Sequence, residues 1–152
     1  MKNSQNKLDV LFVTGNYNKY KDFSKITEDI FNVEQIKLDL PEIQSDPIEV
    51  AKSKSKLAYK LAKKPIITED TSLMLNSYGG LPGAYVKSFL EKIGPMGIYK
   101  MANVFEDRSA IVQCIFCYCY CENKDPIVFI GQMKGQIVEP SGQNNYGFDP
   151  SF

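Results

Sequence analysis

Leu8-Asp-Val-Leu-Phe-Val-Thr-Gly-Asn-Tyr-Asn-Lys-Tyr20 is the most informative segment of the chain, because a strand, a turn and the start of a helix follow one another directly in it. Leu8 to Val13 is a short apolar run typical of a buried strand, and Thr14-Gly15-Asn16 has the residues of a turn. Beyond the turn, apolar positions recur at helical spacing, namely Tyr20, Phe23, Ile26 or Thr27, and Ile30. The stretch therefore predicts a strand that runs through a turn into a helix.

Strands and helices continue to alternate along the chain. Patterning and turn residues predict strands at residues 31–38, 65–68, 109–120 and 127–138, and helices that start at Pro47 and at Pro95. The first of these helices has one apolar stripe, formed by Val50, Ala51, Leu57, Ala58, Leu61 and Ala62. We therefore expect a single mixed α/β domain over residues 1–152.

The composition excludes several classes of function. Lys and Arg total 18, as do Asp and Glu, so no net charge attracts nucleic acid or anionic lipid. No apolar run approaches the roughly 20 residues that cross a bilayer, and the N-terminus has no apolar signal-peptide core. We expect an intracellular protein without nucleic-acid or membrane partners.

The chain contains no histidine, which narrows the chemistry it can perform. Ser-His and Cys-His pairs and His-based zinc sites are excluded, as is the side chain that most often transfers protons near neutral pH. Carboxylates without a His or Cys partner suit a hard cation such as Mg²⁺, and Mg²⁺ in turn suggests phosphate substrates.

The cysteines Cys114, Cys117, Cys119 and Cys121 crowd into one segment. That segment reads as a buried strand, on which Cys117, Cys119 and Cys121 point to one face and Cys114 to the other. Such side chains do not converge tetrahedrally, and no second cysteine pair completes a zinc pattern. Buried reduced thiols are the better interpretation.

The first candidate site is the turn of Thr14, Gly15, Asn16, Tyr17, Asn18 and Lys19. A strand, a small-residue turn and a helix start aim backbone amides and the positive helix end at an anion. Thr14 and Asn16 can donate to phosphate oxygens, and Lys19 supplies charge. The simpler alternative is an N-cap formed by Thr14 or Asn16.

The second candidate is the acidic pair Glu69-Asp70, expected at the end of the strand at residues 65–68. One acid can bind a metal while the other positions or activates a water. Glu42 is a further candidate carboxylate. Lys54 falls within an apolar helix face, where it either reaches the edge of the protein or enters a site. Capping or plain exposure remains the simpler alternative for each single acid.

The third candidate is Gln143-Asn-Asn-Tyr-Gly-Phe-Asp149. Tyr146 or Phe148 would stack on a base, and Asp149 would accept a hydrogen bond. Because a 6-oxopurine carries a proton on N1 and adenine does not, a carboxylate there favours inosine- or xanthosine-type bases by about 1–3 kcal/mol. The alternative is a Gly-aromatic turn.

The order of four motifs carries a resemblance to a known family. They are Phe12-Val-Thr-Gly-Asn-Tyr-Asn-Lys19, Ile67-Thr-Glu-Asp-Thr-Ser72, Gly79-Gly-Leu-Pro-Gly83 and Tyr146-Gly-Phe-Asp-Pro150. Together they resemble the inosine triphosphate pyrophosphatase, or Ham1, family over essentially the whole chain. The resemblance implies an elongated mixed sheet flanked by helices, with two lobes and a central cleft. It also implies cytoplasmic homodimers that hydrolyse ITP, dITP and XTP to the monophosphate and pyrophosphate, with Mg²⁺ and with Mn²⁺ as a substitute.

The resemblance also implies roles for residues, assigned here by match of motif. Thr14 to Lys19 and Lys54 would contact phosphate, Glu69 and Asp70 would serve catalysis, and Glu42 and Asp70 would hold the metal. The substrate-binding set also includes Thr71, beside the acidic pair, and the base-recognition residues Tyr146, Gly147, Phe148 and Asp149.

One departure from the family pattern concerns the end of the chain. Family members continue past the last motif with a lysine and a serine–histidine–arginine segment that contact the nucleotide, whereas this chain stops at Phe152. We therefore expect a shortened form with weakened or lost activity. The alternatives are a Maf-type nucleotide pyrophosphatase and a non-catalytic nucleotide-binding module.

Overall fold

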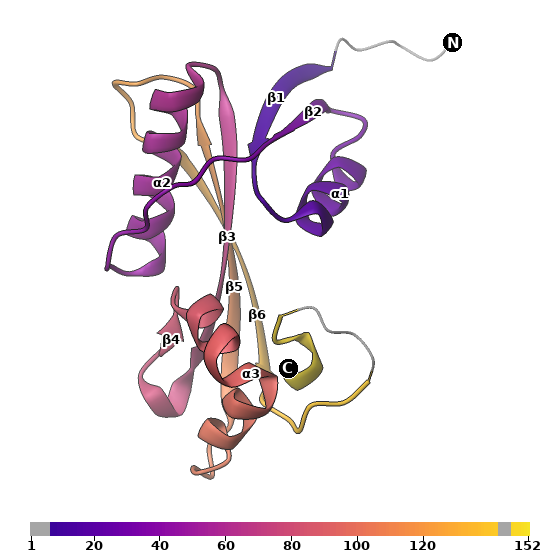
Figure 1. Ribbon diagram of the computed structural model, residues 1–152, viewed down its shortest axis with the longest axis vertical. Helices are drawn as coiled ribbons and strands as arrows, with labels where there is room; N and C mark the ends of the chain where they lie inside the picture. The colour runs from indigo at the N-terminus through magenta and orange to yellow at the C-terminus, as the bar shows by residue number, and fades with distance from the viewer. Residues whose placement is uncertain (1–6, 143–146) are drawn as a thin grey trace. The chain divides into compact units, whose positions relative to one another are not determined.

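The computed structural model describes residues 7–142 and 147–152. Its helices and strands are β1 (Leu8–Val13), α1 (Tyr17–Ile26), β2 (Phe31–Ile36), α2 (Pro47–Ala62), β3 (Ile66–Leu75), β4 (Pro82–Gly83), α3 (Val86–Ala102), β5 (Ser109–Cys119) and β6 (Ile127–Gln136), with 3-10 turns at Asn76–Tyr78 and Asp149–Ser151. Within the described residues the strands form one six-stranded sheet in the order β2-β1-β3-β5-β6, with β4 beside β3. Because β1 is parallel to β2 and β3 while β4 is antiparallel to β3, the predicted mixed α/β sheet with flanking helices is confirmed (Figure 1).

The chain divides into two compact units. Of the described residues, the first unit holds 7–69 and 116–129, and the second holds 70–115, 130–142 and 147–152. The single domain over residues 1–152 stays a prediction. No helix in the described part of the chain is long and apolar enough to cross a membrane.

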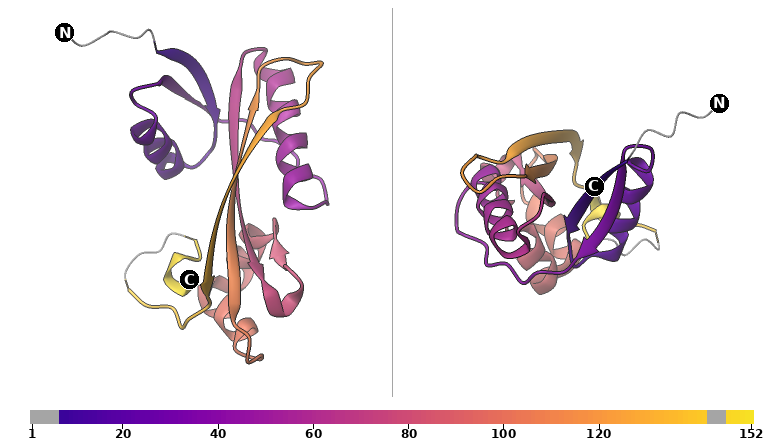
Figure 2. Two further views of the ribbon diagram at one scale, coloured as in Figure 1. Left: turned by 180° about the vertical axis from the view of Figure 1, so that it is seen from behind. Right: turned by 90° about the horizontal axis from the view of Figure 1, so that it is seen from above.

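The core of the first unit is built around β1. Phe12 packs on the α1 side, where its ring stacks on Phe23 with the ring centroids 4.6 Å apart. Leu11 lies on the opposite face, in a buried cluster with Ala58 of α2. Helices α1 and α2 therefore cover opposite faces of β1 (Figure 2), and the strand is apolar on both sides, as a central parallel strand must be.

Helix α2 begins as the sequence predicts and buries a different stripe. Pro47 is its first residue, and the Asp46 carboxylate caps it by accepting hydrogen bonds from the amides of Ile48 and Glu49. The buried residues are Val50, Ala51, Ser55 and Ala58. Leu61, expected in the stripe, lies in the last turn of the helix and is 58% exposed. Three of the four buried residues, Ala51, Ser55 and Ala58, have small side chains.

Strand β3 is longer than predicted and corrects the position of the acidic pair. It runs from Ile66 to Leu75, so Glu69 and Asp70 lie within the strand and not at its end. The residues after the acids pair with β4, in the register Leu73 with Gly83. The strand therefore continues past the two acids, whose charges had suggested its end.

The core of the second unit forms where α3 packs on β3 and β5. Leu73, Ile98 and Ala110 belong to one buried cluster there. The helix begins at Val86, well before the predicted start at Pro95, and ends at Ala102. Gly94, with φ 64° and ψ −179°, interrupts it, so Pro95 opens the second segment of a kinked helix.

The remaining element ends differ by a few residues. Strand β2 ends at Ile36, β5 at Cys119 and β6 at Gln136, each before its predicted end, and α1 ends at Ile26. On β5 the predicted alternation is confirmed for Cys117 and Cys119, which are both buried, and for Cys114, which is half-buried on the other face. Cys121 follows the end of the strand.

Candidate active site

The turn between β1 and α1 is organised by its own side chains. Asn16 is the N-cap of α1, and its Oδ1 accepts hydrogen bonds from the amides of Asn18 at 2.9 Å and Lys19 at 3.2 Å. The Asn16 amide in turn donates to Thr14 Oγ1 at 3.1 Å. The N-cap interpretation is therefore confirmed. Because the cap occupies two of the helix-end amides, an anion here would meet chiefly the side chains and the positive helix end.

The other two residues of the predicted phosphate segment are open to solvent. Gly15 is exposed, and no atom lies within 4 Å of the position that a Cβ would take. Tyr17 is exposed as the first residue of α1, and its ring lies 6.0 Å from that of Tyr20. A ligand can therefore approach the turn from the solvent side.

Gln35 is a residue of this turn that sequence reasoning missed. From β2, its Nε2 donates to the carbonyl oxygen of Thr14 at 2.9 Å. The neighbouring Ile36 accepts from the Thr14 amide at 3.0 Å, so β2 holds Thr14 at both backbone groups. The sequence shows only that Gln35 is a polar residue near the end of a strand. Its role at Thr14 can be inferred only when β2 is known to pair with β1.

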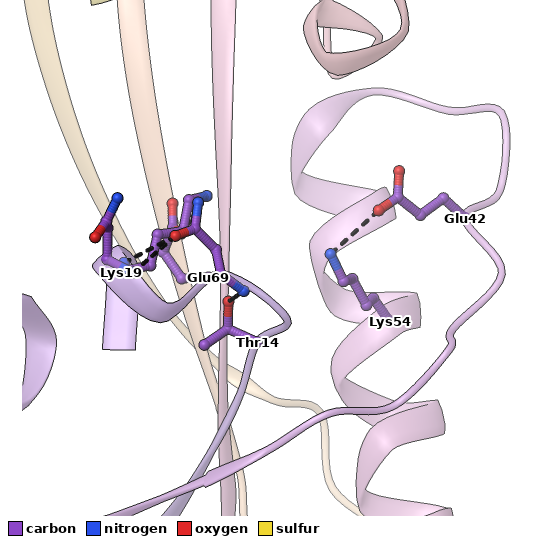
Figure 3. A network of polar contacts seen from close by, with 7 residues as sticks. Thr14, Lys19, Glu42, Lys54 and Glu69 are labelled. Atoms are coloured by element: carbon purple, nitrogen blue, oxygen red, sulfur yellow. Dashed lines mark hydrogen bonds and ion pairs between the residues drawn. The ribbon is translucent and has the colours of Figure 1, made fainter. Parts of the chain in front are cut away.

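Lys19 forms an ion pair with Glu69, which joins the first two candidate sites. The Nζ of Lys19 lies 2.5 Å from Glu69 Oε2 (Figure 3). The Glu69 side chain is only 5% exposed, and a carboxylate so nearly buried requires an opposite charge or hydrogen bonds. Helix α1 supplies the lysine and β3 the acid, fifty positions apart in the sequence.

Lys54 and Glu42 form a second pair within the same unit. The Nζ of Lys54, on α2, lies 3.1 Å from Oε1 of Glu42, in the segment before that helix (Figure 3). The lysine side chain is 18% exposed and the glutamate side chain 50% exposed. Lys54 thus reaches a candidate site residue instead of solvent alone, whereas Glu42 stays accessible to a ligand.

Asp70 and Thr71 follow Glu69 directly in β3 and belong to the second unit. Both are half-buried, between the buried Glu69 and the buried Ser72. The strand is buried at every position from Ile66 to Glu69, and the two residues are the first in it that are partly exposed. Neighbouring side chains of a regular strand point to opposite faces, so the buried Glu69 and the half-buried Asp70 are expected to face different sides of the sheet.

The base-recognition segment is partly described. Tyr146 lies outside the described residues. Gly147 has φ +57°, which favours glycine, and Asp149 is exposed at the start of a 3-10 turn. Phe148 is only 9% exposed and packs in the core of the second unit, with its ring edge-on to Phe152. In this structure Phe148 supports the turn and does not present its ring for stacking on a base.

The Asp, Glu and Cys side chains of the site determine which metal it could bind. In the described part of the chain, no three Asp, Glu or Cys side chains gather into a metal-binding group. Mg²⁺ is commonly held by one or two carboxylates together with substrate phosphates, and Glu42, Glu69 and Asp70 are carboxylates of that kind. No disulfide joins the four cysteines to one another, and burial raises the pKa of the Cys119 thiol, which disfavours the thiolate that a metal binds.

Comparison with known proteins places the chain in a family. The model of the Ham1 family matches residues 10–152, which include every candidate site residue. This chain belongs to the Ham1 family. The Ham1 assignment agrees with the order of motifs from Phe12 to Pro150.

Two curated relatives and one solved structure extend the Ham1 match. The chain is 44% identical to an inosine triphosphate pyrophosphatase of Puccinia graminis f. sp. tritici, across 95% of this chain and 79% of the relative. It is 43% identical to inosine triphosphate pyrophosphatase 2 of Trypanosoma cruzi, across 94% of this chain and 74% of the relative. A HAM1 protein from Coxiella burnetii superposes with a TM-score of 0.82 at 25% identity, across 95% of this chain and 81% of that one.

Proposed function

We propose that this protein is a nucleoside-triphosphate pyrophosphatase that hydrolyses ITP, dITP and XTP to the monophosphate and pyrophosphate and so removes non-standard purines from the nucleotide pool. The similarity to enzymes named inosine triphosphate pyrophosphatase supports the activity. The structural observation that carries it is the Lys19–Glu69 pair, which sets a cation and a carboxylate beside the capped turn at Thr14. Phosphate binding and water activation need these two kinds of group.

The phosphate-binding role falls on the turn and on two lysines. Thr14 and Asn16 donate to phosphate oxygens, Lys19 and Lys54 supply positive charge, and the exposed Gly15 allows close approach. The α1 N-terminus adds a partial positive charge. Tyr17, Asn18 and Thr71 complete the proposed binding set.

The proposed metal is Mg²⁺, with Mn²⁺ as a substitute. Glu42 and Asp70 would hold it, since carboxylate oxygens are the ligands that such cations prefer. When bound, the metal would draw charge from the phosphate oxygens and make the phosphorus more electrophilic. Glu42 suits this role because half of its side chain is exposed.

In the proposed reaction the chain forms no covalent bond to the substrate. A water adds to the α-phosphorus, the anhydride bond to the β-phosphate breaks, and pyrophosphate leaves. Glu69 or Asp70 accepts the proton of the water, as a general base or through an ordered second water. Lys19 and Lys54 balance the charge that builds on the leaving pyrophosphate.

Base selection is proposed to rest on Asp149. Its carboxylate is exposed and follows Phe148, whose burial anchors the turn. A 6-oxopurine donates its N1 proton to a carboxylate. Adenine N1 carries no proton, so its lone pair would repel the carboxylate oxygen. We therefore expect ITP to be preferred over ATP, with Tyr146 and Gly147 completing the base-binding segment.

Pyrophosphate release from ITP with Mg²⁺ tests this function. We expect turnover by the wild-type protein and a loss of about 10²–10⁴-fold in kcat for Asp70→Asn if Asp70 acts on the water. Asp29→Asn, an exposed acid beyond α1, is the matched control and should keep full activity. Faster turnover of dTTP or UTP than of ITP would favour the Maf-type alternative. Tight ITP binding without product, unchanged by Asp70→Asn, would identify a non-catalytic module.

The proposed setting is a cytoplasmic homodimer that acts on a small nucleotide, with neither nucleic acid nor membrane as partner. The family resemblance supports the dimer, and the balanced charge supports the absence of a polyanionic partner. Analytical ultracentrifugation over a range of concentrations tests the dimer: a single species of 17.2 kDa throughout would contradict it.

A further inference from the structure

Each lysine proposed to bind phosphate is already paired with an acid proposed to serve the metal or the water. Lys19 Nζ lies 2.5 Å from Glu69, and Lys54 Nζ lies 3.1 Å from Glu42 (Figure 3). Both pairs lie within the first unit. The positive charges that would attract a triphosphate are therefore neutralised by carboxylates of the same site.

We infer that Glu42 is a specificity-determining counter-ion that favours the metal complex of a triphosphate over metal-free polyphosphate. The inference rests on the proposed function of this site. To bind a metal-free triphosphate, Lys54 would have to leave Glu42, which would then face the incoming phosphates as a like charge. When a divalent cation arrives with the phosphates, Glu42 gains a new partner as Lys54 is released.

The two pairs differ in how readily they can exchange partners. Glu69 is fixed within β3 and its side chain is 5% exposed, so its pairing with Lys19 is set by the fold. Glu42 lies in the irregular segment before α2, and half of its side chain is exposed. Glu42 is consequently the acid that can turn toward a cation, and it is also the one that can be replaced without disturbing the core.

Helix α2 offers a matched control. Lys52 on the same helix pairs with Glu49 at 3.2 Å, and that pair is a surface contact one turn apart. Glu49→Gln removes the same charge as Glu42→Gln and leaves the proposed phosphate lysines untouched. A difference between the two variants therefore reports the Glu42–Lys54 pair and not the net charge.

The experiment measures binding of inorganic tripolyphosphate by calorimetry, in EDTA and in Mg²⁺, to the full chain and to both variants. We expect Glu42→Gln to tighten metal-free binding about two- to fivefold, the size of a partly exposed ion pair, and to reduce the gain that Mg²⁺ gives. Glu49→Gln should match the wild-type protein in both buffers. Melting temperatures of the variants verify that each is folded.

Two results would overturn the inference, and they can be told apart from failure of the function. Equal metal-free affinities for Glu42→Gln and Glu49→Gln, or weaker binding by Glu42→Gln, would refute the counter-ion role even if wild-type protein hydrolyses ITP. If wild-type protein neither hydrolyses ITP nor binds tripolyphosphate with Mg²⁺, the proposed function fails and the inference fails with it.

Discussion

Replacing Asn16 by Asp separates the two roles of this side chain, as the cap of α1 and as a donor to phosphate. An aspartate can accept the same hydrogen bonds from the amides of Asn18 and Lys19. Its charge also interacts favourably with the helix N-terminus, by about 0.3–1 kcal/mol. Asn16→Asp should therefore keep or slightly raise the melting temperature. Asn16→Ala, which removes both accepted bonds, should cost about 1 kcal/mol, or about 2–4 °C.

Asn16→Asp should weaken substrate binding, although it keeps or slightly raises the melting temperature. Asn16→Asp replaces an amide donor by a negative charge at the place proposed for the phosphates. One added charge about 4 Å from a phosphate costs about 1 kcal/mol in water and about 4 kcal/mol at an effective dielectric constant near 20. We expect kcat/KM for ITP to fall between about fivefold and several hundredfold, while the melting temperature is kept or slightly raised.

A second cap in the same unit provides the control. Asp46 caps α2 with accepted bonds of 3.0 and 3.1 Å from Ile48 and Glu49, much as Asn16 caps α1. Asp46→Ala should match Asn16→Ala in thermal unfolding, followed by circular dichroism, and should leave kcat/KM nearly unchanged at a temperature where both are folded. If Asn16→Asp keeps wild-type kcat/KM, Asn16 does not face the phosphates and its role is the cap alone.

Three further predictions concern positioning, pH and the core. Gln35→Leu removes the bond to the Thr14 carbonyl and should raise KM for ITP more than it lowers kcat; equal melting with an unchanged KM would show that Gln35 does not position the turn. The hydrogen bond from Lys56 lowers the pKa of Asp125 and raises that of Lys56, so this exposed pair stabilises the fold between about pH 4 and pH 10. The difference in melting temperature between wild type and Asp125→Asn should be present at pH 7 and should vanish as the pH falls below the lowered pKa of Asp125; a difference that persists in acid would contradict the pairing. Phe12→Ala should cost about 3–5 kcal/mol in urea unfolding, because Phe12 is 1% exposed and stacks on Phe23, and a cost below about 1 kcal/mol would refute its place in the core.

The sequence predicted those strands, caps and helix starts that depend on residues close together in the chain. The apolar run of β1, the Asn16 cap and the start of α2 at Pro47 each depend on residues within one or two helical turns. Strand ends were less predictable. Glu69-Asp70 suggested the end of a strand, but pairing of Leu73 with β4 carries β3 onward to Leu75.

The residue types of the candidate site could be read from the sequence, and the order of its motifs pointed to the Ham1 family that the comparisons confirm. Which side chains meet became known from the three-dimensional structure alone. Lys19 joins Glu69, and Gln35 joins Thr14, through the parallel pairing of β1 with β2 and β3. The structure also shows that Phe148 is a core residue. The physical reason is that periodicity reports the face on which a side chain lies, whereas its partner depends on which strands pair and in what register.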